Sequence, residues 1–142
     1  MVVSAGLEEL HAELARRGHD ELRPAHGYAL NAILNGSRTA SELAPRLGMT
    51  KQGAAKLVQH LLEHGYVDEG PADDDGRRKP LTLTRKGRRA VALSVSIQQA
   101  IEDRWGDLAG VDTMATARRA LEAVALEQSE PGGGLPPVRP TR

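Results

Sequence analysis

The sequence has 142 residues and no cysteine, and its 19 basic side chains balance its 19 acidic ones. This length suits one domain with a single core, and the lack of cysteine excludes disulfides, thiolate metal sites and cysteine-based redox sensing. Since no apolar run approaches the ~20 residues that span a bilayer and no signal peptide is evident, we expect a soluble, cytoplasmic protein with no membrane partner.

The charges are unevenly distributed along the chain. Residues 38–89 carry 11 Lys or Arg and 7 Asp or Glu, a net charge of +4, whereas the rest carries 8 basic and 12 acidic residues, a net charge of −4. DNA binding needs positive charge near the phosphates and not a basic chain overall. The zero net charge is therefore compatible with a nucleic-acid contact made by the middle of the chain.

Two helices are predicted near the N-terminus. Leucine and alanine recur at helical spacing over residues 4–17, and Gly18 would end that helix. Pro24 stands where helices often begin, and Asn35 followed by glycine is a typical stop, so residues 25–34 form the second predicted helix.

A third, short helix follows, and its start is open between two positions. Thr39 and Glu42 match a capping box, which predicts a helix over residues 40–47. Pro45 would then remove one internal hydrogen bond, and a later start with Ser41 as the cap would place the proline in the first turn or just past it. The sequence leaves both starts open.

A fourth helix is predicted over residues 51–64, between a Thr50 cap and Gly65. The side chains of its apolar inner face are Ala54, Leu57, Val58 and Leu61. The outward face holds two lysines and several amide or imidazole donors, with Glu63 as its only acid. The sequence therefore predicts an amphipathic helix with a basic outer face.

This outer face has the chemistry to bind DNA. The major groove admits one helix, whose N-terminal turns reach base edges, and the free amides next to Thr50 suit a phosphate. The predicted DNA contacts on this helix are Thr50, Lys51, Gln52, Lys56, Gln59 and His60. An ordinary helix with a solvated polar face is the alternative. Gly53 should cost on the order of 1 kcal/mol against alanine, and it either lets the helix backbone approach DNA or has no role.

A hairpin with a charged tip is predicted next. Residues 66–69 and 81–83 are its strands, and the polar segment 71–80 joins them. The tip residues assigned to DNA are Asp75, Arg77, Arg78 and Lys79. An arginine there would enter the minor groove or contact flanking phosphates, with Asp75 fixing its direction. A solvated charge run is the alternative.

Two more helices are predicted after the hairpin. Thr84 would cap a long helix that reaches about Trp105, and Gly106 and Gly110 would break it. Asp112 would cap the sixth helix.

Two short helices joined by a glycine turn, followed by a hairpin and a long helix, form the element order of a winged helix-turn-helix. Over roughly residues 25–90 the sequence resembles the multiple-antibiotic-resistance regulator (MarR) family. The stretches that carry this resemblance are Ser41-Glu-Leu-Ala-Pro-Arg-Leu-Gly-Met-Thr50, Lys56-Leu-Val58, residues 61–67 with Gly65, Asp75-Gly-Arg77 and Leu83-Thr-Arg-Lys-Gly87. Each stretch is weak alone, but their order and spacing are specific.

The resemblance implies a mostly α-helical fold with a small β-hairpin and about six helices. It also implies a homodimer, interlocked through its N- and C-terminal helices, that binds a pseudo-palindromic operator in double-stranded DNA, usually as a repressor. In this family the residues matching Thr50, Lys51, Gln52 and Lys56 contact the major groove, and those matching Asp75 and Arg77 form the wing tip and enter the minor groove. The expected divisions of the chain are 1–24 as an N-terminal dimerisation helix, 25–88 as the DNA-binding region, 89–129 as C-terminal dimerisation helices and 130–142 as a disordered tail.

Many members of this family release DNA when a small phenolic or other ligand binds. The sequence does not display such a pocket. His26, Tyr28 and Trp105 are the first candidates to line one, although ordinary packing is the simpler interpretation of each.

Other activities find little support in the sequence. His60-Leu-Leu-Glu-His64 matches a zinc-peptidase pattern, but the chain is too short for that enzyme fold, and zinc or pH sensing by these histidines is a minor alternative. No phosphate-binding loop, nucleophile elbow or dinucleotide motif is present, so we expect neither an enzyme nor a cofactor. The main alternative to a DNA-binding regulator is a winged-helix module for protein–protein interaction or dimerisation.

Overall fold

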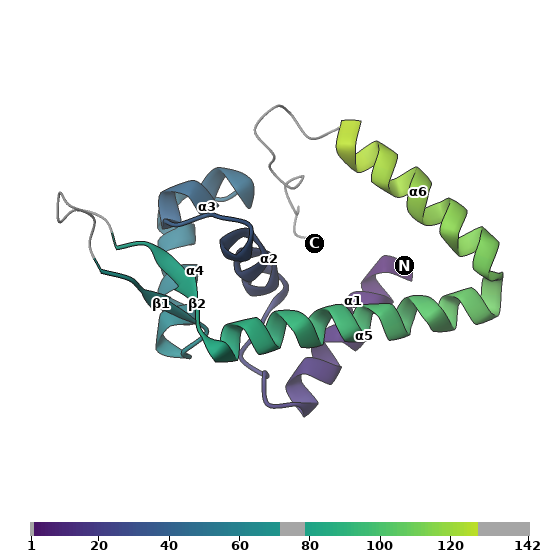
Figure 1. Ribbon diagram of the computed structural model, residues 1–142, viewed down its shortest axis with the longest axis horizontal. Helices are drawn as coiled ribbons and strands as arrows, with labels where there is room; N and C mark the ends of the chain where they lie inside the picture. The colour runs from purple at the N-terminus through teal and green to yellow at the C-terminus, as the bar shows by residue number, and fades with distance from the viewer. Residues whose placement is uncertain (1, 72–78, 128–142) are drawn as a thin grey trace.

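The computed structural model describes residues 2–71 and 79–127 of the chain (Figure 1). Within these ranges it contains six helices and one two-stranded antiparallel sheet. In chain order the elements are α1 (Val2–Arg16), α2 (Pro24–Leu34), α3 (Ala40–Arg46), α4 (Lys51–Glu63), β1 (Val67–Glu69), β2 (Leu81–Leu83), α5 (Arg85–Ala109) and α6 (Val111–Glu127). The predicted mostly helical fold with a small hairpin is confirmed.

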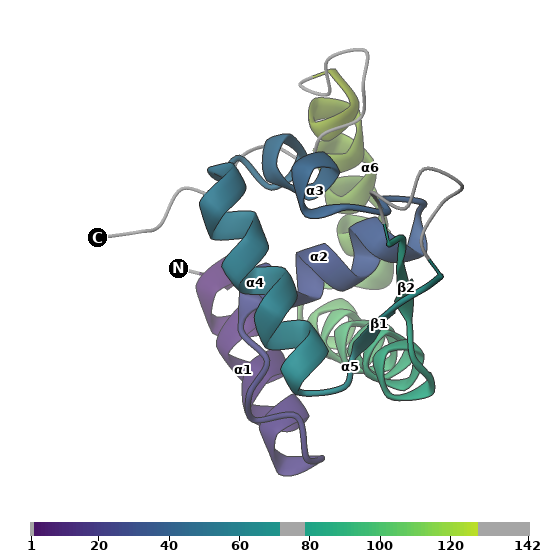
Figure 2. The ribbon, with the colours of Figure 1, turned by 90° about the vertical axis from the view of Figure 1, so that its left-hand side faces the viewer.

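The larger core lies where α2, α3, α4, the hairpin and the start of α5 meet (Figure 2). Its side chains are leucine, isoleucine, valine and alanine, with the fully buried Tyr66 as its one aromatic. In the hairpin Val67 pairs with Leu83. Leu81 and Leu83 are buried and Thr82 between them is exposed, because alternate residues of a strand point to opposite faces.

The smaller core lies where α1 crosses α5 (Figure 1). Leu10 and Leu14 of α1 pack there with Ile97 and Ile101 of α5. The crossing is close at Gly6, where a Cβ atom would lie 2.9 Å from the Trp105 ring. Since α5 also contributes buried residues to the larger core, this one helix joins the two cores.

The structure settles where α3 starts. Thr39 is its N-cap, and the Thr39 hydroxyl accepts a hydrogen bond of 3.2 Å from the Glu42 amide. The Glu42 carboxylate in turn accepts from the Arg38 amide at 2.6 Å, one residue earlier than in the usual capping box. The alternative start with Ser41 as the cap is therefore wrong, and Pro45 lies inside the helix. The two cap bonds offset the single bond that Pro45 removes.

The predicted break in α5 at Gly106 is wrong, because the helix continues through it to Ala109. Gly106 is buried, and a Cβ atom there would be in van der Waals contact with Val111 at the start of α6. The chain turns at Gly110, whose φ of +92° suits glycine. Asp112 does not precede α6 as a cap but lies in its first turn, where a carboxylate favours the helix dipole.

The expectations of no membrane-spanning helix and of a disordered tail can be compared with the described residues only. No helix in residues 2–71 and 79–127 is long and apolar enough to cross a membrane. The segment expected to be a disordered tail, residues 130–142, lies outside the described residues.

Candidate nucleic-acid interface

The fourth helix has the two faces that the sequence predicts. Its apolar side chains, Ala54, Leu57, Val58 and Leu61, are all buried. Lys51, Gln52 and Lys56 are exposed on the opposite side, in the first two turns. The buried face fixes the orientation of α4, so the outer face presents two ammonium groups and one amide to solvent.

Thr50 serves first as a cap. Its hydroxyl accepts a hydrogen bond of 3.0 Å from the Gly53 amide, which leaves the hydroxyl proton free to donate to a phosphate. A Cβ atom at Gly53 would lie 3.3 Å from this hydroxyl oxygen, a tight contact that limits which side chains the first turn accepts.

Gln59 lies farther along the same face and is partly engaged. Its side-chain amide donates to the Glu63 carboxylate at 2.9 Å. Eight residues separate it from Lys51, which places it about 12 Å along the helix. The side-chain oxygen of Gln59 and its second amide proton remain available to a ligand.

The structure places His60 apart from the other predicted contacts. Its ring stacks on His26 of α2 with centroids 4.2 Å apart and an interplanar angle of 4°. Its Nε2 lies 3.0 Å from the Glu21 carbonyl oxygen, before α2. The His64 ring also lies beside His60, with centroids 4.1 Å apart and the rings tilted by 31°. We call His26, His60 and His64 the histidine stack, which packs α4 against α2.

Within the histidine stack, His26 is held in the neutral form. The Arg23 amide donates to Nδ1 of His26 at 2.9 Å, which a protonated ring would not allow. Burial, and then the neighbouring His60 and Arg23, lower the pKa of His26 to about 4. Among the described residues no group of three or more His, Asp or Glu is arranged to hold a metal ion.

The wing is described at its base. Lys79 lies 3.5 Å from the Glu69 carboxylate across the hairpin, and both side chains are exposed. The Leu81 amide donates to the Arg38 carbonyl at 2.8 Å, which ties β2 to the segment before α3. The other three predicted tip contacts, Asp75, Arg77 and Arg78, lie outside the described residues.

A part-buried polar network lies next to the turn after α4, and its residues were not predicted as functional from the sequence. The Tyr66 hydroxyl donates to the Glu21 carboxylate at 3.0 Å, and Lys86 donates to the same carboxylate at 2.9 Å. Burial alone would raise the pKa of Glu21, but the hydrogen bonds from Lys86 and Tyr66 lower it to about 2. His19 Nδ1 lies 2.7 Å from the Tyr66 hydroxyl. No sequence motif links these residues, because they are distant in the chain.

The start of α5 lies very close to this network. A Cβ atom at the buried Gly87 would lie 2.1 Å from the Tyr66 carbonyl oxygen. The Thr84 hydroxyl caps α5 by accepting from the Gly87 amide at 3.0 Å and donates to the Gly65 carbonyl at 2.7 Å. The direction in which α5 leaves the hairpin is thus fixed by backbone contacts.

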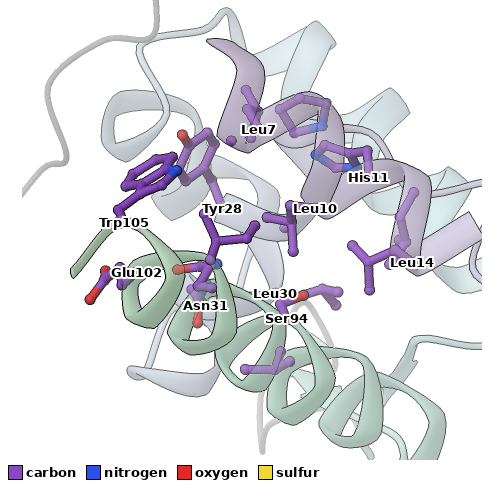
Figure 3. Close-up of a pocket in the computed structure, with 17 residues that line it drawn as sticks. Leu7, Leu10, His11, Leu14, Tyr28, Leu30, Asn31, Ser94, Glu102 and Trp105 are labelled. Atoms are coloured by element: carbon purple, nitrogen blue, oxygen red, sulfur yellow. The ribbon is translucent and has the colours of Figure 1, made fainter. Parts of the chain in front are cut away.

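A pocket of about 300 Å³ lies between α1, α2 and α5 (Figure 3). Tyr28 and Trp105 line it, as two of the three residues singled out from the sequence, whereas His26 belongs to the histidine stack. Much of the lining is apolar, with Leu10 and Leu14 contributed by α1. The buried Nδ1 of His11 has no hydrogen-bond partner among the described residues. The pocket therefore combines apolar walls with polar groups from several elements.

Residues 21–78 match the family model described as MarR family. The stretch from before α2 to the wing is therefore similar to the MarR family. Solved structures of similar fold include the transcriptional repressor CouR bound to a 23-mer DNA duplex, with 23% sequence identity, a TM-score of 0.69, and coverage of 87% of each chain. Another is a Mycobacterium tuberculosis MarR family protein in complex with salicylic acid, with 23% identity, a TM-score of 0.65, and coverage of 87% of this chain and 90% of that one. The fold is that of winged helix-turn-helix proteins such as a Rhodococcus transcriptional regulator of the MarR family.

Curated relatives of this chain are of two kinds. A riboflavin kinase of Pyrobaculum calidifontis is 35% identical over 91 residues, which cover 64% of this chain and 37% of the kinase. The chain thus spans well under half the length of that relative. An uncharacterised protein of Mycobacterium tuberculosis is 27% identical over 131 residues, which cover 89% of this chain and 90% of that protein.

Proposed function

We propose that this chain is a MarR-family repressor that binds a pseudo-palindromic operator as a homodimer, and that a small-molecule ligand releases it. The observation that carries the DNA part is the outer face of α4. Lys51, Gln52 and Lys56 are exposed on its first two turns while the apolar side chains behind them are buried. A helix held in this way can present its first turns to the major groove.

Each predicted contact has a role in the proposed complex. Lys51 and Gln52 face base edges, and Lys56 and the Thr50 hydroxyl bind phosphates. Arg77 and its neighbours at the wing tip contact the minor groove or its phosphates. His60 has no role in this proposal, because its ring packs within the histidine stack. The structures of CouR and of a Staphylococcus aureus MepR mutant bound to DNA support the proposal as proteins of the same fold.

The homodimer is supported by apolar side chains left exposed near the C-terminal helices. Leu108 is 86% exposed, Val111 72% and Leu121 68%. Burial of each such side chain is worth roughly 1.5–3 kcal/mol, so a partner surface that covers them is favoured. In the proposed dimer α1, α5 and α6 form the shared interface and residues 25–88 bind DNA. The two copies of α4 then lie about one DNA turn, 34–36 Å, apart.

The pocket between α1, α2 and α5 supports the ligand part of the proposal. Its walls come from helices assigned to the dimer and from α2 of the DNA-binding region, so an occupant would contact both. Apolar walls with Tyr28, Trp105 and the unpartnered His11 nitrogen suit a small aromatic molecule that carries a hydrogen-bonding group. The related M. tuberculosis protein holds salicylic acid.

The riboflavin kinase relatives do not extend the proposal to an enzyme. The chain spans 37% and 42% of the two kinases, and its described residues form a winged helix-turn-helix with flanking helices. We therefore propose no kinase activity.

The test is DNA binding by the purified chain as a function of salt. The duplex is the DNA upstream of its own gene, and a shuffled duplex of equal length serves as the control. We expect specific binding whose affinity falls steeply between 50 and 200 mM salt, by about 10³-fold or more if six or more phosphates are contacted. Lys56→Ala should reduce this salt dependence, whereas Lys56→Arg, which keeps the positive charge, should leave it unchanged.

Absent binding, or binding that does not change with salt, would favour the protein-interaction module without a DNA role.

Addition of salicylate to the complex tests the ligand part separately. Release that is lost in His11→Phe and Trp105→Ala variants supports the pocket, and release unchanged by both variants rejects it.

A further inference from the structure

A second hollow lies at the opposite end of α4 from Thr50, where α1 ends and α5 begins. It has a volume of about 590 Å³ and is lined by Arg17, Arg85, Lys86 and Arg89 together with His19 and Thr84. None of its lining residues is acidic, and none has a large apolar side chain. The hollow is therefore suited to a charged ligand and unsuited to an apolar one.

Two of the four cations already have carboxylate partners. Arg17 Nε lies 2.6 Å from the Glu13 carboxylate, and Lys86 Nζ lies 2.9 Å from the Glu21 carboxylate. Arg85 and Arg89 are exposed and form no salt bridge within the described ranges. Four cations less two carboxylates leave an excess of two positive charges at the hollow.

His19 adds no further charge at neutral pH, because burial lowers its pKa below the usual value near 6.5. Its Nδ1 is engaged with the Tyr66 hydroxyl. The positive potential of the hollow therefore comes from the arginines and Lys86, and does not depend on titration near pH 7.

The hollow is separate from the surface proposed to read DNA. α4 has 13 residues, so Gly65 at the hollow lies about 20 Å along the helix from Thr50. Figure 2 shows the two ends of α4 at opposite edges of the winged helix-turn-helix, with the start of α4 next to α3. A DNA segment held by the first turns of α4 does not need these arginines.

We propose that this hollow binds a phosphate-class anion, a small molecule that presents phosphate oxygens to Arg85 and Arg89. Guanidinium groups match phosphate with two parallel hydrogen bonds each, and both arginines are free to turn toward a ligand. They lie four residues apart on α5, so they share one side of the helix. This site goes beyond the proposed function, since neither operator binding nor the pocket between α1, α2 and α5 uses it.

Pyrophosphate is the probe that tests the site. It is titrated into the full chain by calorimetry at constant ionic strength, with sodium chloride as the compensating salt. We expect saturable binding in the unmodified chain, and at least a ~tenfold loss of affinity in the Arg85→Gln/Arg89→Gln double variant. Arg88→Gln is the matched control, because Arg88 is exposed on the same turns but does not line the hollow. It should change the affinity by less than ~twofold.

Three results would overturn the proposal. One is a signal with pyrophosphate that does not saturate, and another is equal affinity in the double variant and the unmodified chain. The third concerns the source of the phosphate. If the double variant also loses DNA affinity, and DNA displaces pyrophosphate, the DNA backbone fills the hollow. Since all three side chains are exposed, unchanged thermal unfolding of each variant will show that the fold is kept.

Discussion

Lys51 and Gln52 stand in the first turn of α4, where the side chains of a groove-bound helix reach base edges. Arg77 belongs to the wing tip, which we assign to the minor groove and its phosphates. The first turn of α4 can distinguish DNA sequences, because base edges differ from one sequence to another. The wing tip distinguishes them less, because phosphates are the same in every sequence.

Replacement of these side chains should separate the two kinds of contact. We expect Lys51→Ala or Gln52→Ala to change the preferred operator sequence at a cost of about 1–3 kcal/mol on the best site. Arg77→Ala should weaken binding on all sequences alike and reduce the salt slope by ~1. Selection from randomised duplexes and salt titrations measure both effects. The same loss on every sequence for all three variants would contradict this division.

His26 gives the fold a pH dependence with a defined sign. Burial lowers its pKa to about 4, against an ordinary value of 6.5, so between these values the unfolded chain binds a proton that the folded chain does not. The contribution of His26 to the free energy of unfolding is therefore complete above pH 6.5 and falls as the pH drops toward 4. The lowered pKa values of His11 and His19 act in the same direction.

Urea unfolding at pH 7.5 and pH 5 measures this dependence. We expect the unmodified chain to unfold at lower urea at pH 5, and His26→Gln to lose less on acidification, because its amide can accept the Arg23 hydrogen bond and does not titrate. The difference between the two chains isolates His26 from the other histidines. An equal loss in both would show that His26 does not contribute.

At the scale of elements, the close approach of α5 to the turn after α4 is the most constrained contact. A Cβ atom at Gly87 would lie 2.1 Å from a backbone oxygen that cannot move without displacing β1. We expect Gly87→Ala to destabilise the fold by about 1–3 kcal/mol or more, since added atoms in a packed core force backbone shifts. The urea midpoint measures the loss.

Gly27→Ala in α2 is the matched control for this prediction. No atom lies within 4 Å of the Cβ position there, so alanine should gain up to ~1 kcal/mol through its higher helix propensity. A Gly87→Ala variant as stable as the Gly27→Ala variant would contradict the assigned role of the contact.

The elements that the sequence predicted well are those defined by local chemistry. Thr39, Thr50 and Thr84 each cap the helix that follows, because a hydroxyl needs only the amide three residues on. The inner face of α4 was also predicted, since apolar periodicity reports burial directly.

The remaining features depend on residues that are distant in the chain. Gly106 and Gly110 look alike in the sequence, and only the packing of α6 on α5 makes one a helix interior and the other a turn. His60 lies at the margin of the outer face, and its direction is decided by His26 of α2 and by the Glu21 carbonyl before α2. For the same reason the Tyr66 network and the basic hollow had no signal in the sequence.

At the scale of the whole molecule, the exposed apolar side chains near the start of α6 predict that this helix holds the dimer. Removal of residues 112–142 should give a monomer in light scattering, and tight operator binding should be lost with it. Removal of residues 130–142 alone is the control and should leave the dimer intact. A shortened monomer that still binds an operator tightly would contradict the interlocked dimer.

The length of α5 gives the Gly87 contact a further consequence. This helix has 25 residues and is about 37 Å long, and it carries one end in the DNA-binding region and the other near the proposed dimer interface. A tilt of about 5° at Gly87 displaces the far end by about 3 Å, close to the 3.4 Å rise of one base pair. In the proposed dimer two copies of α5 meet. We therefore expect the distance between the two copies of α4, and with it the number of base pairs between half-sites, to depend on how closely Gly87 approaches the Tyr66 carbonyl oxygen.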